Sequence, residues 1–154
     1  MELWLLAVGK LRPAYREACD DYLRRLGRRA KVHELEVREA ARAPTRAVQQ
    51  AEEAERLRAR LPQRARVVAL AREGTGWTST DLARRLERWE TDGRPLAFLI
   101  GGSTGLDPDL VAKADARWSL GPLTLPHELA RVVVAEQLYR AGTIRRGEPY
   151  HKGR

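Results

Sequence analysis

The chain has 154 residues, a formal net charge of +8 and a sequence pI of about 10.3. Its 43% hydrophobic and 32% charged residues are typical of a globular domain and exclude a disordered chain. Among the 29 basic residues only four are lysine, so the arginine excess indicates either a nucleic-acid partner or compositional drift toward arginine and alanine.

The first quarter of the chain predicts a strand, a helix and a second strand. Residues 3–8 form an apolar run that stops at Gly9, which indicates a buried strand. Residues 13–26 have helical spacing of apolar side chains, with Ala14 on the expected inner face. Apolar and acidic side chains alternate over 32–37, which predicts a half-exposed strand toward the edge of the sheet.

The middle of the chain continues this alternation. Residues 44–61 predict a charged helix with a thin apolar stripe. Residues 67–71 predict another buried strand, and a loop is expected over 72–76. We expect Ser79 or Thr80 to cap the helix that follows, because both residue types favour the first position before a helix.

A glycine pair marks the next strand end. The short apolar run 96–100 predicts a strand covered on both faces, and it stops at Gly101 and Gly102. A short helix over 108–114 is expected next, with Asp107 as its cap. Ligands of open parallel α/β sheets bind beyond the carboxyl ends of strands, so this loop is a candidate binding site.

A second glycine loop precedes the last helix. The apolar run 118–120 predicts a strand that breaks at Gly121, and the last helix is expected over 126–141. That helix is apolar nearly all round, whereas its own sheet covers only one side. We therefore expect another subunit to cover the rest; the alternative is a covering loop.

The order of elements indicates an α/β class. Strands and helices alternate from end to end, which predicts a mostly parallel sheet flanked by helices. Nothing in the sequence suggests a linker or repeat, so we expect one domain over 1–154. Cys19 is the only cysteine and no stretch is long enough to span a membrane, which favours a cytoplasmic protein.

One motif suggests a serine hydrolase. The sequence GGSTG at 101–105 fits the G-x-S-x-G pattern between a strand and a helix, with Ser103 as nucleophile. The candidate partners are Asp107, Asp109, Asp115 or Glu128 as acid and His127 or His151 as base. The three histidines and single cysteine show no metal-ligand spacing, so no metal is expected.

The C-terminal tail suggests RNA binding. Residues 145–154 interleave basic side chains with Tyr150 and His151, and such residues hold phosphates and stack on unpaired bases. The alternatives are a frayed terminus and, for the whole chain, a non-catalytic RNA-binding module.

Several motifs together resemble the ribosomal RNA large-subunit methyltransferase H family. The likeness extends over the whole chain, including VG at 8–9, YLRR at 22–25 and LERW at 86–89. Its most specific motifs are LIGG at 99–102, WSL at 118–120, LTLPH at 123–127, RV at 131–132, AEQLYRA at 135–141 and PYH at 149–151.

The resemblance implies a fold, an activity and partners. The fold would be a SPOUT-type α/β domain with a C-terminal trefoil knot, which is a rare topology. The activity would be methylation of N3 of a pseudouridine in 23S rRNA of the assembled ribosome, with S-adenosylmethionine as cofactor. The protein would be a homodimer with neither a metal nor a membrane partner.

The resemblance also implies site residues. The cofactor pocket would consist of Leu70, Gly101, Gly102, Leu120, Gly121, Pro122, Leu123, Thr124, Leu125 and Pro126. The candidate catalytic residues are Tyr150, which can stack on the target base, and three candidate bases for the N3 proton: Glu136, His127 and His151. This chain has Ser103 and Thr104 where the family commonly has proline and an acidic residue.

Overall fold

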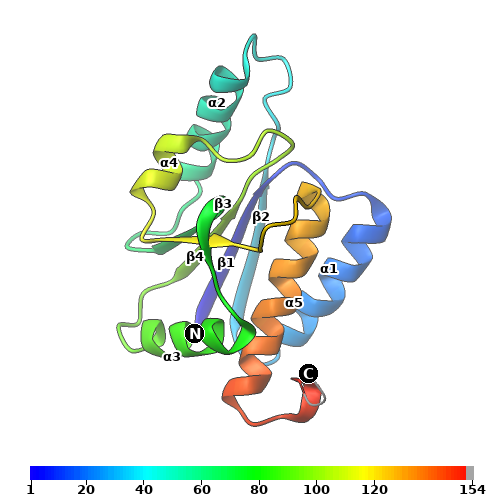
Figure 1. Ribbon diagram of the computed structural model, residues 1–154, viewed down its shortest axis with the longest axis vertical. Coiled ribbons are helices and arrows are strands. Elements are labelled where there is room, and N and C mark those ends of the chain that lie inside the picture. Colours follow the sequence, from blue (N-terminus) through cyan, green and yellow to red (C-terminus); the bar gives the residue numbers. More distant parts are fainter. Residues whose placement is uncertain (152–154) are drawn as a thin grey trace.

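The computed structural model describes residues 1–151, and of His151 the backbone only. These residues form five strands and five helices, followed by a short 3-10 turn (Figure 1). The strands are β1 (Glu2–Val8), β2 (Lys31–Val37), β3 (Arg66–Gly76), β4 (Leu96–Ile100) and β5 (Ala116–Ser119); the helices are α1 (Pro13–Leu26), α2 (Arg46–Arg58), α3 (Ser79–Glu90), α4 (Pro108–Lys113) and α5 (His127–Arg145); the turn is η1 (Pro149–His151).

The five strands make one parallel sheet in the order β2-β1-β4-β3-β5. Every residue of β4, at the centre, is buried, as expected for a strand covered on both faces. β2 lies at the edge, as its alternating sequence predicts. The sequence-based prediction of a parallel α/β sheet is therefore confirmed. All carboxyl ends of the strands lie along one rim.

Helices cover both faces of the sheet (Figure 1). On one face α1, α3 and α5 pack over Leu3, Leu5 and Phe98. On the other face α2 and α4 pack over the side chains that point the other way from the same strands, including Leu6 and Leu99. This arrangement follows from the two-residue period of a strand, which sends successive side chains to opposite faces.

The prediction of a loop over 72–76 is wrong, because β3 continues through these residues. After Leu70 the pairing with β5 shifts register, and Thr75 and Gly76 pair with Trp118 and Ser119. A polar, glycine-rich segment has weak strand propensity, and neighbouring backbone decides its conformation here. Gly74 allows this approach, since a Cβ there would lie 2.8 Å from backbone atoms of Arg117.

Several helix boundaries also differ from the sequence-based prediction. α2 is shorter than 44–61, because Thr45 caps it by accepting the Val48 N–H. The cap of α3 is Thr78, not Ser79 or Thr80, because Thr78 and Asp81 form a reciprocal capping box. α5 extends beyond Ala141 to Arg145. In α1, Ala14 is exposed rather than on the inner face, whereas Cys19 and Leu26 are buried.

The covering of α5 differs from the expectation as well. The helix lies between α1 and α3 and packs on the sheet, so its own chain covers three of its sides. Leu129, at 36% exposure, remains on the outer side near the start of the helix. None of the described helices has the length and apolarity needed to cross a membrane.

Candidate functional site

A cavity of about 590 Å³ opens at the carboxyl ends of β4, β3 and β5. Its walls come from the 101–106 turn after β4, from Leu70 and its neighbours in β3, from the loop after β5, and from His127 and Ala130 at the start of α5. The volume lies in the range of small-molecule sites, and the place is the one that parallel sheets use for ligands.

The cavity collects the residues proposed for a cofactor pocket. All of them line it except Pro122, which is exposed. The lining members are Leu70, Gly101, Gly102, Leu120, Gly121, Leu123, Thr124, Leu125 and Pro126. Sequence reasoning missed Arg46, Arg72 and Trp118, which also line it.

Backbone packing makes the 101–105 turn tight. A Cβ on Gly101 would lie 2.6 Å from the carbonyl carbon of Gly105 and 2.7 Å from the nitrogen of Leu106. Gly105 has a φ of +76° and its N–H donates to the Gly102 carbonyl at 3.1 Å. Glycine at 101 therefore lets the first residues of the turn pack directly against its last residues. Backbone atoms, not side chains, form this part of the cavity wall.

Residues from the other side of the sheet hold this turn. The Thr104 carbonyl accepts hydrogen bonds from Gln50 Nε2 at 2.6 Å and from Arg46 Nη2 at 3.0 Å, both from α2. The Ser103 hydroxyl donates to the Glu39 carboxylate at 2.9 Å. The partner of Ser103 is thus an acid, whereas in a Ser-His-acid triad the serine donates to a histidine.

The loop after β5 closes the cavity on the other side. Ser119 Oγ accepts the Gly121 N–H at 3.2 Å, and Gly121 has a φ of +116°. Leu123, farther along, is 75% exposed. This loop offers backbone N–H and C=O groups and leucine side chains to the cavity, which suits a ligand with both a heterocycle and apolar parts.

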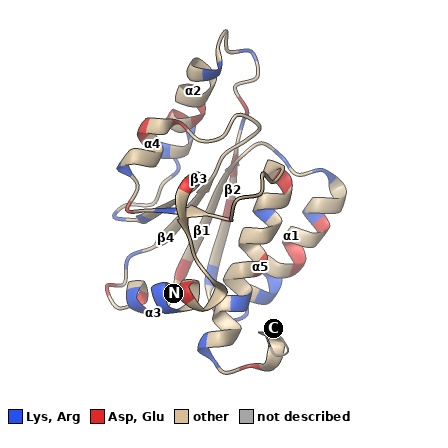
Figure 2. Cartoon of the chain, in the orientation of Figure 1, with Lys and Arg blue, Asp and Glu red and all other residues tan. Residues whose placement is uncertain are grey.

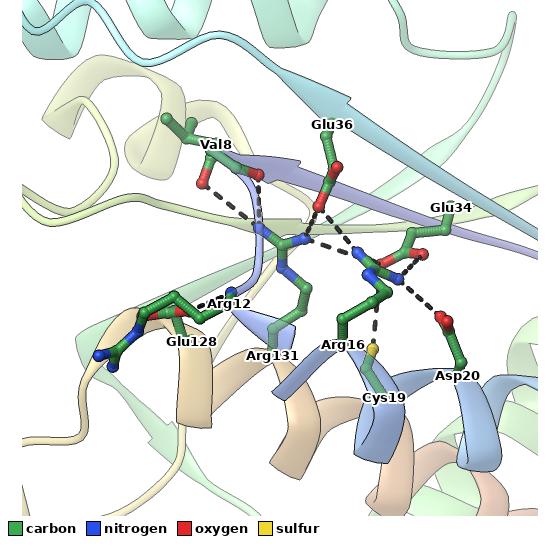
Figure 3. Close-up of polar contacts among 10 residues, drawn as sticks. Val8, Arg12, Arg16, Cys19, Asp20, Glu34, Glu36, Glu128 and Arg131 are labelled. Carbon is green, nitrogen blue, oxygen red and sulfur yellow. Dashed lines mark hydrogen bonds and ion pairs between the residues drawn. The ribbon is translucent and has the colours of Figure 1, made fainter. Parts of the chain in front are cut away.

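A buried charged network fixes the start of α5 beside the cavity (Figure 3). The Arg131 side chain is 1% exposed, pairs with Glu36 and donates to the Gly9 carbonyl at 2.8 Å. Arg16 of α1 bridges Glu34 at 2.6 Å and Glu36 at 2.8 Å. The network therefore ties α5 to the carboxyl ends of β1 and β2, next to the cavity.

A second contact supports the first turn of α5. Glu128 accepts the Arg12 backbone N–H at 2.7 Å and the Arg12 Nε at 2.8 Å (Figure 3). Both contacts lower the pKa of the Glu128 carboxyl below its ordinary value, and the hydrogen bond from the Arg12 backbone N–H has the larger effect. The contact joins the segment after β1 to the helix turn that carries His127.

The aromatic tail folds back against the second half of α5, beyond the first turns that line the cavity. The Tyr150 hydroxyl donates to Glu136 Oε1 at 3.2 Å, and the Arg140 guanidinium stands 4.9 Å from the Tyr150 ring centroid. Arg140 Nε also donates to Glu136, at 2.8 Å. Burial, with the neighbouring Tyr22 and Glu136, raises the pKa of the Tyr150 phenol, so the phenol remains a donor.

Within one chain the structure brings Glu136 and Tyr150 together but leaves His127 apart from them. His127 lines the cavity, whereas Glu136 lies nine residues farther along α5, about 13 Å at the helical rise. Tyr150 follows the helix in sequence but turns back to Glu136, and its hydroxyl lies 3.2 Å from Glu136 Oε1. The His151 side chain and residues 152–154 fall outside the described residues. Within the described part, no group of His, Cys, Asp and Glu side chains could hold a metal ion.

Comparisons by sequence point to one family. The profile of the family described as "Predicted SPOUT methyltransferase" matches residues 1–151. The chain is 47% identical over 153 residues to "Ribosomal RNA large subunit methyltransferase H" of Anaeromyxobacter sp. (strain Fw109-5), covering 99% of this chain and 100% of that protein. It is 44% identical over 155 residues to the protein of the same name from Paraburkholderia xenovorans (strain LB400), covering 99% of each.

Two solved structures share the fold. A probable methylase family protein from Haemophilus influenzae Rd KW20 matches 98% of this chain and 70% of its own, with a TM-score of 0.59 and 10% identity. The SpoU methyltransferase AviRb from Streptomyces viridochromogenes, solved in complex with AdoMet, matches 93% of this chain and 61% of its own, with a TM-score of 0.51 and 16% identity.

Proposed function

Since this chain belongs to the SPOUT methyltransferase family, we propose that it methylates N3 of a pseudouridine in 23S rRNA, with S-adenosylmethionine as the methyl donor. Relatives at 44% and 47% identity carry the name of a large-subunit rRNA methyltransferase, which supports rRNA methylation as the activity of this chain. The observation that carries the proposal is the cavity at the strand ends, lined by the residues that the resemblance assigns to the cofactor.

The cavity fits the chemistry of this cofactor. The leucines of the loop after β5 would enclose the adenine, and loop N–H and C=O groups would recognise its edge. The side-chain-free wall at Gly101 allows close approach, and a Cβ there would disturb the turn. When bound, the cofactor supplies a methyl group on a sulfonium. The residues around it contribute alignment of that group with the attacking nitrogen.

The substrate side needs a group that takes the N3 proton. His127 lines the cavity and is the candidate base from the same chain. Glu136 is engaged by Arg140, Gln137 and Tyr150, which suits a residue that holds the tail. Tyr150 would stack on the target base, and His151 remains a candidate base. The Pro149–His151 segment has to reach a cavity for either to act.

We infer that the tail serves the cavity of a second copy. Tyr150 contacts Glu136, nine residues after His127, so about 13 Å of helix separates the cavity lining from Tyr150 of the same chain. In an antiparallel pair of α5 helices, the tail of each chain would lie beside the cavity of the other. Leu129 and Val133, one helical turn apart, would contribute to the contact. Val133→Arg is then expected to yield monomers or aggregates.

Two measurements test the function directly. Calorimetry should detect binding of S-adenosylmethionine, and methyl transfer should occur on assembled ribosomes in preference to free rRNA. Tight rRNA binding with no cofactor affinity at millimolar ligand would instead favour a non-catalytic RNA-binding module. The trefoil knot and the cytoplasmic location remain predictions.

Ser103 separates the proposal from the serine-hydrolase alternative. Ser103→Ala should leave methyl transfer near the wild-type rate, because its hydroxyl only donates to Glu39. A hydrolase would lose all activity with this change. Labelling of wild-type Ser103 by a serine-reactive phosphonate would contradict the methyltransferase proposal.

A further inference from the structure

The segment between β2 and the first turn of α2 contains three exposed arginines: Arg38, Arg42 and Arg46. In Figure 2 basic positions are blue along this segment. Among the described residues, no carboxylate lies within ion-pair distance of any of the three. Other arginines of the chain, such as Arg16 and Arg131, are held by acidic partners. The three guanidinium groups therefore keep their charge available to an external anion.

This segment is fixed in place rather than loosely attached. The Ala40 N–H donates to Glu53 Oε2 at 2.9 Å, and Glu53 is only 2% exposed. Arg56 donates to the Arg38 carbonyl at 2.6 Å. These two contacts anchor the loop backbone to α2, so the arginines are displayed from a defined surface.

The same segment touches the wall of the cavity. Arg46 lines the cavity and donates to the Thr104 carbonyl, and Gln50 donates to the same oxygen. Glu39, between Arg38 and Arg42 in the chain, accepts from the Ser103 hydroxyl. The arginines thus lie on a surface that is continuous with the cavity.

We propose that Arg38, Arg42 and Arg46, the β2–α2 arginines, bind the phosphate backbone of the RNA substrate next to the cavity. This inference rests on the proposed function and adds a contact surface to it. Guanidinium groups without an internal counter-charge suit phosphate oxygens, and such contacts position a nucleic acid without reading its sequence. Their attachment to the 101–105 turn would place the bound RNA against the cofactor wall.

The test compares two double variants that each remove two positive charges. Arg38→Gln with Arg42→Gln removes the proposed contacts but keeps Arg46, which also supports the turn. Arg60→Gln with Arg64→Gln is the matched control, because both arginines are exposed and have no ion pair among the described residues. They follow the other end of α2, about 20 Å away along its 13 residues.

The readout is the KM for ribosomes at several salt concentrations, together with the Kd for S-adenosylmethionine. In the Arg38/Arg42 variant we expect a several-fold higher KM and a log–log salt slope reduced by about 2, one for each phosphate contact. The cofactor Kd should stay within two-fold of wild type. The control variant should keep the wild-type slope.

Two results would overturn the proposal. Equal effects in both double variants would mean that only overall charge matters, and a raised KM with an unchanged salt slope would exclude phosphate contacts. Fluorescence anisotropy with a labelled 23S rRNA fragment keeps the test independent of catalysis. If the wild type binds no cofactor, the proposed function fails, and the two variants still report on RNA binding.

Discussion

Gly101→Ala is the substitution that tests the cavity wall most sharply. The added Cβ would lie 2.6 Å from the Gly105 carbonyl carbon and 2.7 Å from the Leu106 nitrogen. Both atoms belong to backbone, so no side-chain rotation can relieve the contact. The turn itself has to move, and with it the wall of the cavity.

Gly105→Ala is the matched control within the same turn. Its Cβ would meet no atom within 4 Å, but its φ of +76° is unfavourable for alanine. Overpacking at Gly101 should cost about 1–3 kcal/mol. The left-handed conformation at Gly105 should cost about 1–2 kcal/mol. For a chain of this size each kcal/mol lowers Tm by about 2–4 °C. Both variants should therefore have a Tm several degrees below that of the wild type.

Cofactor binding should separate the two variants. We expect Gly101→Ala to weaken S-adenosylmethionine binding at least ten-fold by calorimetry, because the wall is displaced. Gly105→Ala should stay within about three-fold of wild type, because its strain is local. Wild-type affinity in the Gly101 variant, or equal losses in both, would refute the assignment of the turn as the cofactor wall.

Four further predictions concern Glu128, Cys19 and the tail. Because the pKa of Glu128 is lowered in the folded chain, its stabilisation is present above pH about 4.5 and is lost as the pH falls. Glu128→Gln should flatten the acid side of a Tm-against-pH curve, and an unchanged curve would exclude this linkage. Burial, assisted by Glu34, raises the pKa of the Cys19 thiol to about 12, so a thiol reagent should label it only in denaturant; rapid labelling of the folded protein would show that the helix opens there. Deleting residues 150–154 should abolish methyl transfer but leave cofactor binding within a few-fold, and loss of cofactor binding would remove the substrate role from the tail. Mixing that deletion with Gly102→Trp should restore one working site per heterodimer, whereas no recovery would place the tail within its own subunit.

The sequence predicted the arrangement of elements well, for a physical reason. The apolar runs at β1 and β4 are too short for helices and are bounded by glycine, so periodicity and length agree. The prediction was wrong for the second half of β3. Residues 72–76 lack the apolar pattern of a strand, and they form one only through pairing with β5. Local patterns carry no information about such a partner.

The site was predictable where it follows strand ends. The resemblance named the glycine turn and the loop after β5, and these residues line the cavity. Arg46 and Gln50 were not predicted, because they reach the Thr104 carbonyl from a helix more than 50 residues earlier. Arg131 was visible only as an odd charge in an apolar helix, and its partners Glu36 and Gly9 come from two other elements. Contacts of this kind can be predicted only when the order of the strands in the sheet is known, and the sequence does not determine that order.

The most direct test of the methyltransferase assignment uses labelled S-adenosylmethionine and ribosomes that lack the modification. After incubation with the purified protein, 23S rRNA is digested to nucleosides, and the labelled nucleoside is identified by mass spectrometry. We expect about one labelled methyl per ribosome, carried on N3 of a pseudouridine, and no label with Gly102→Trp. Label on a different nucleoside, or no transfer by a wild-type protein that binds the cofactor, would contradict it.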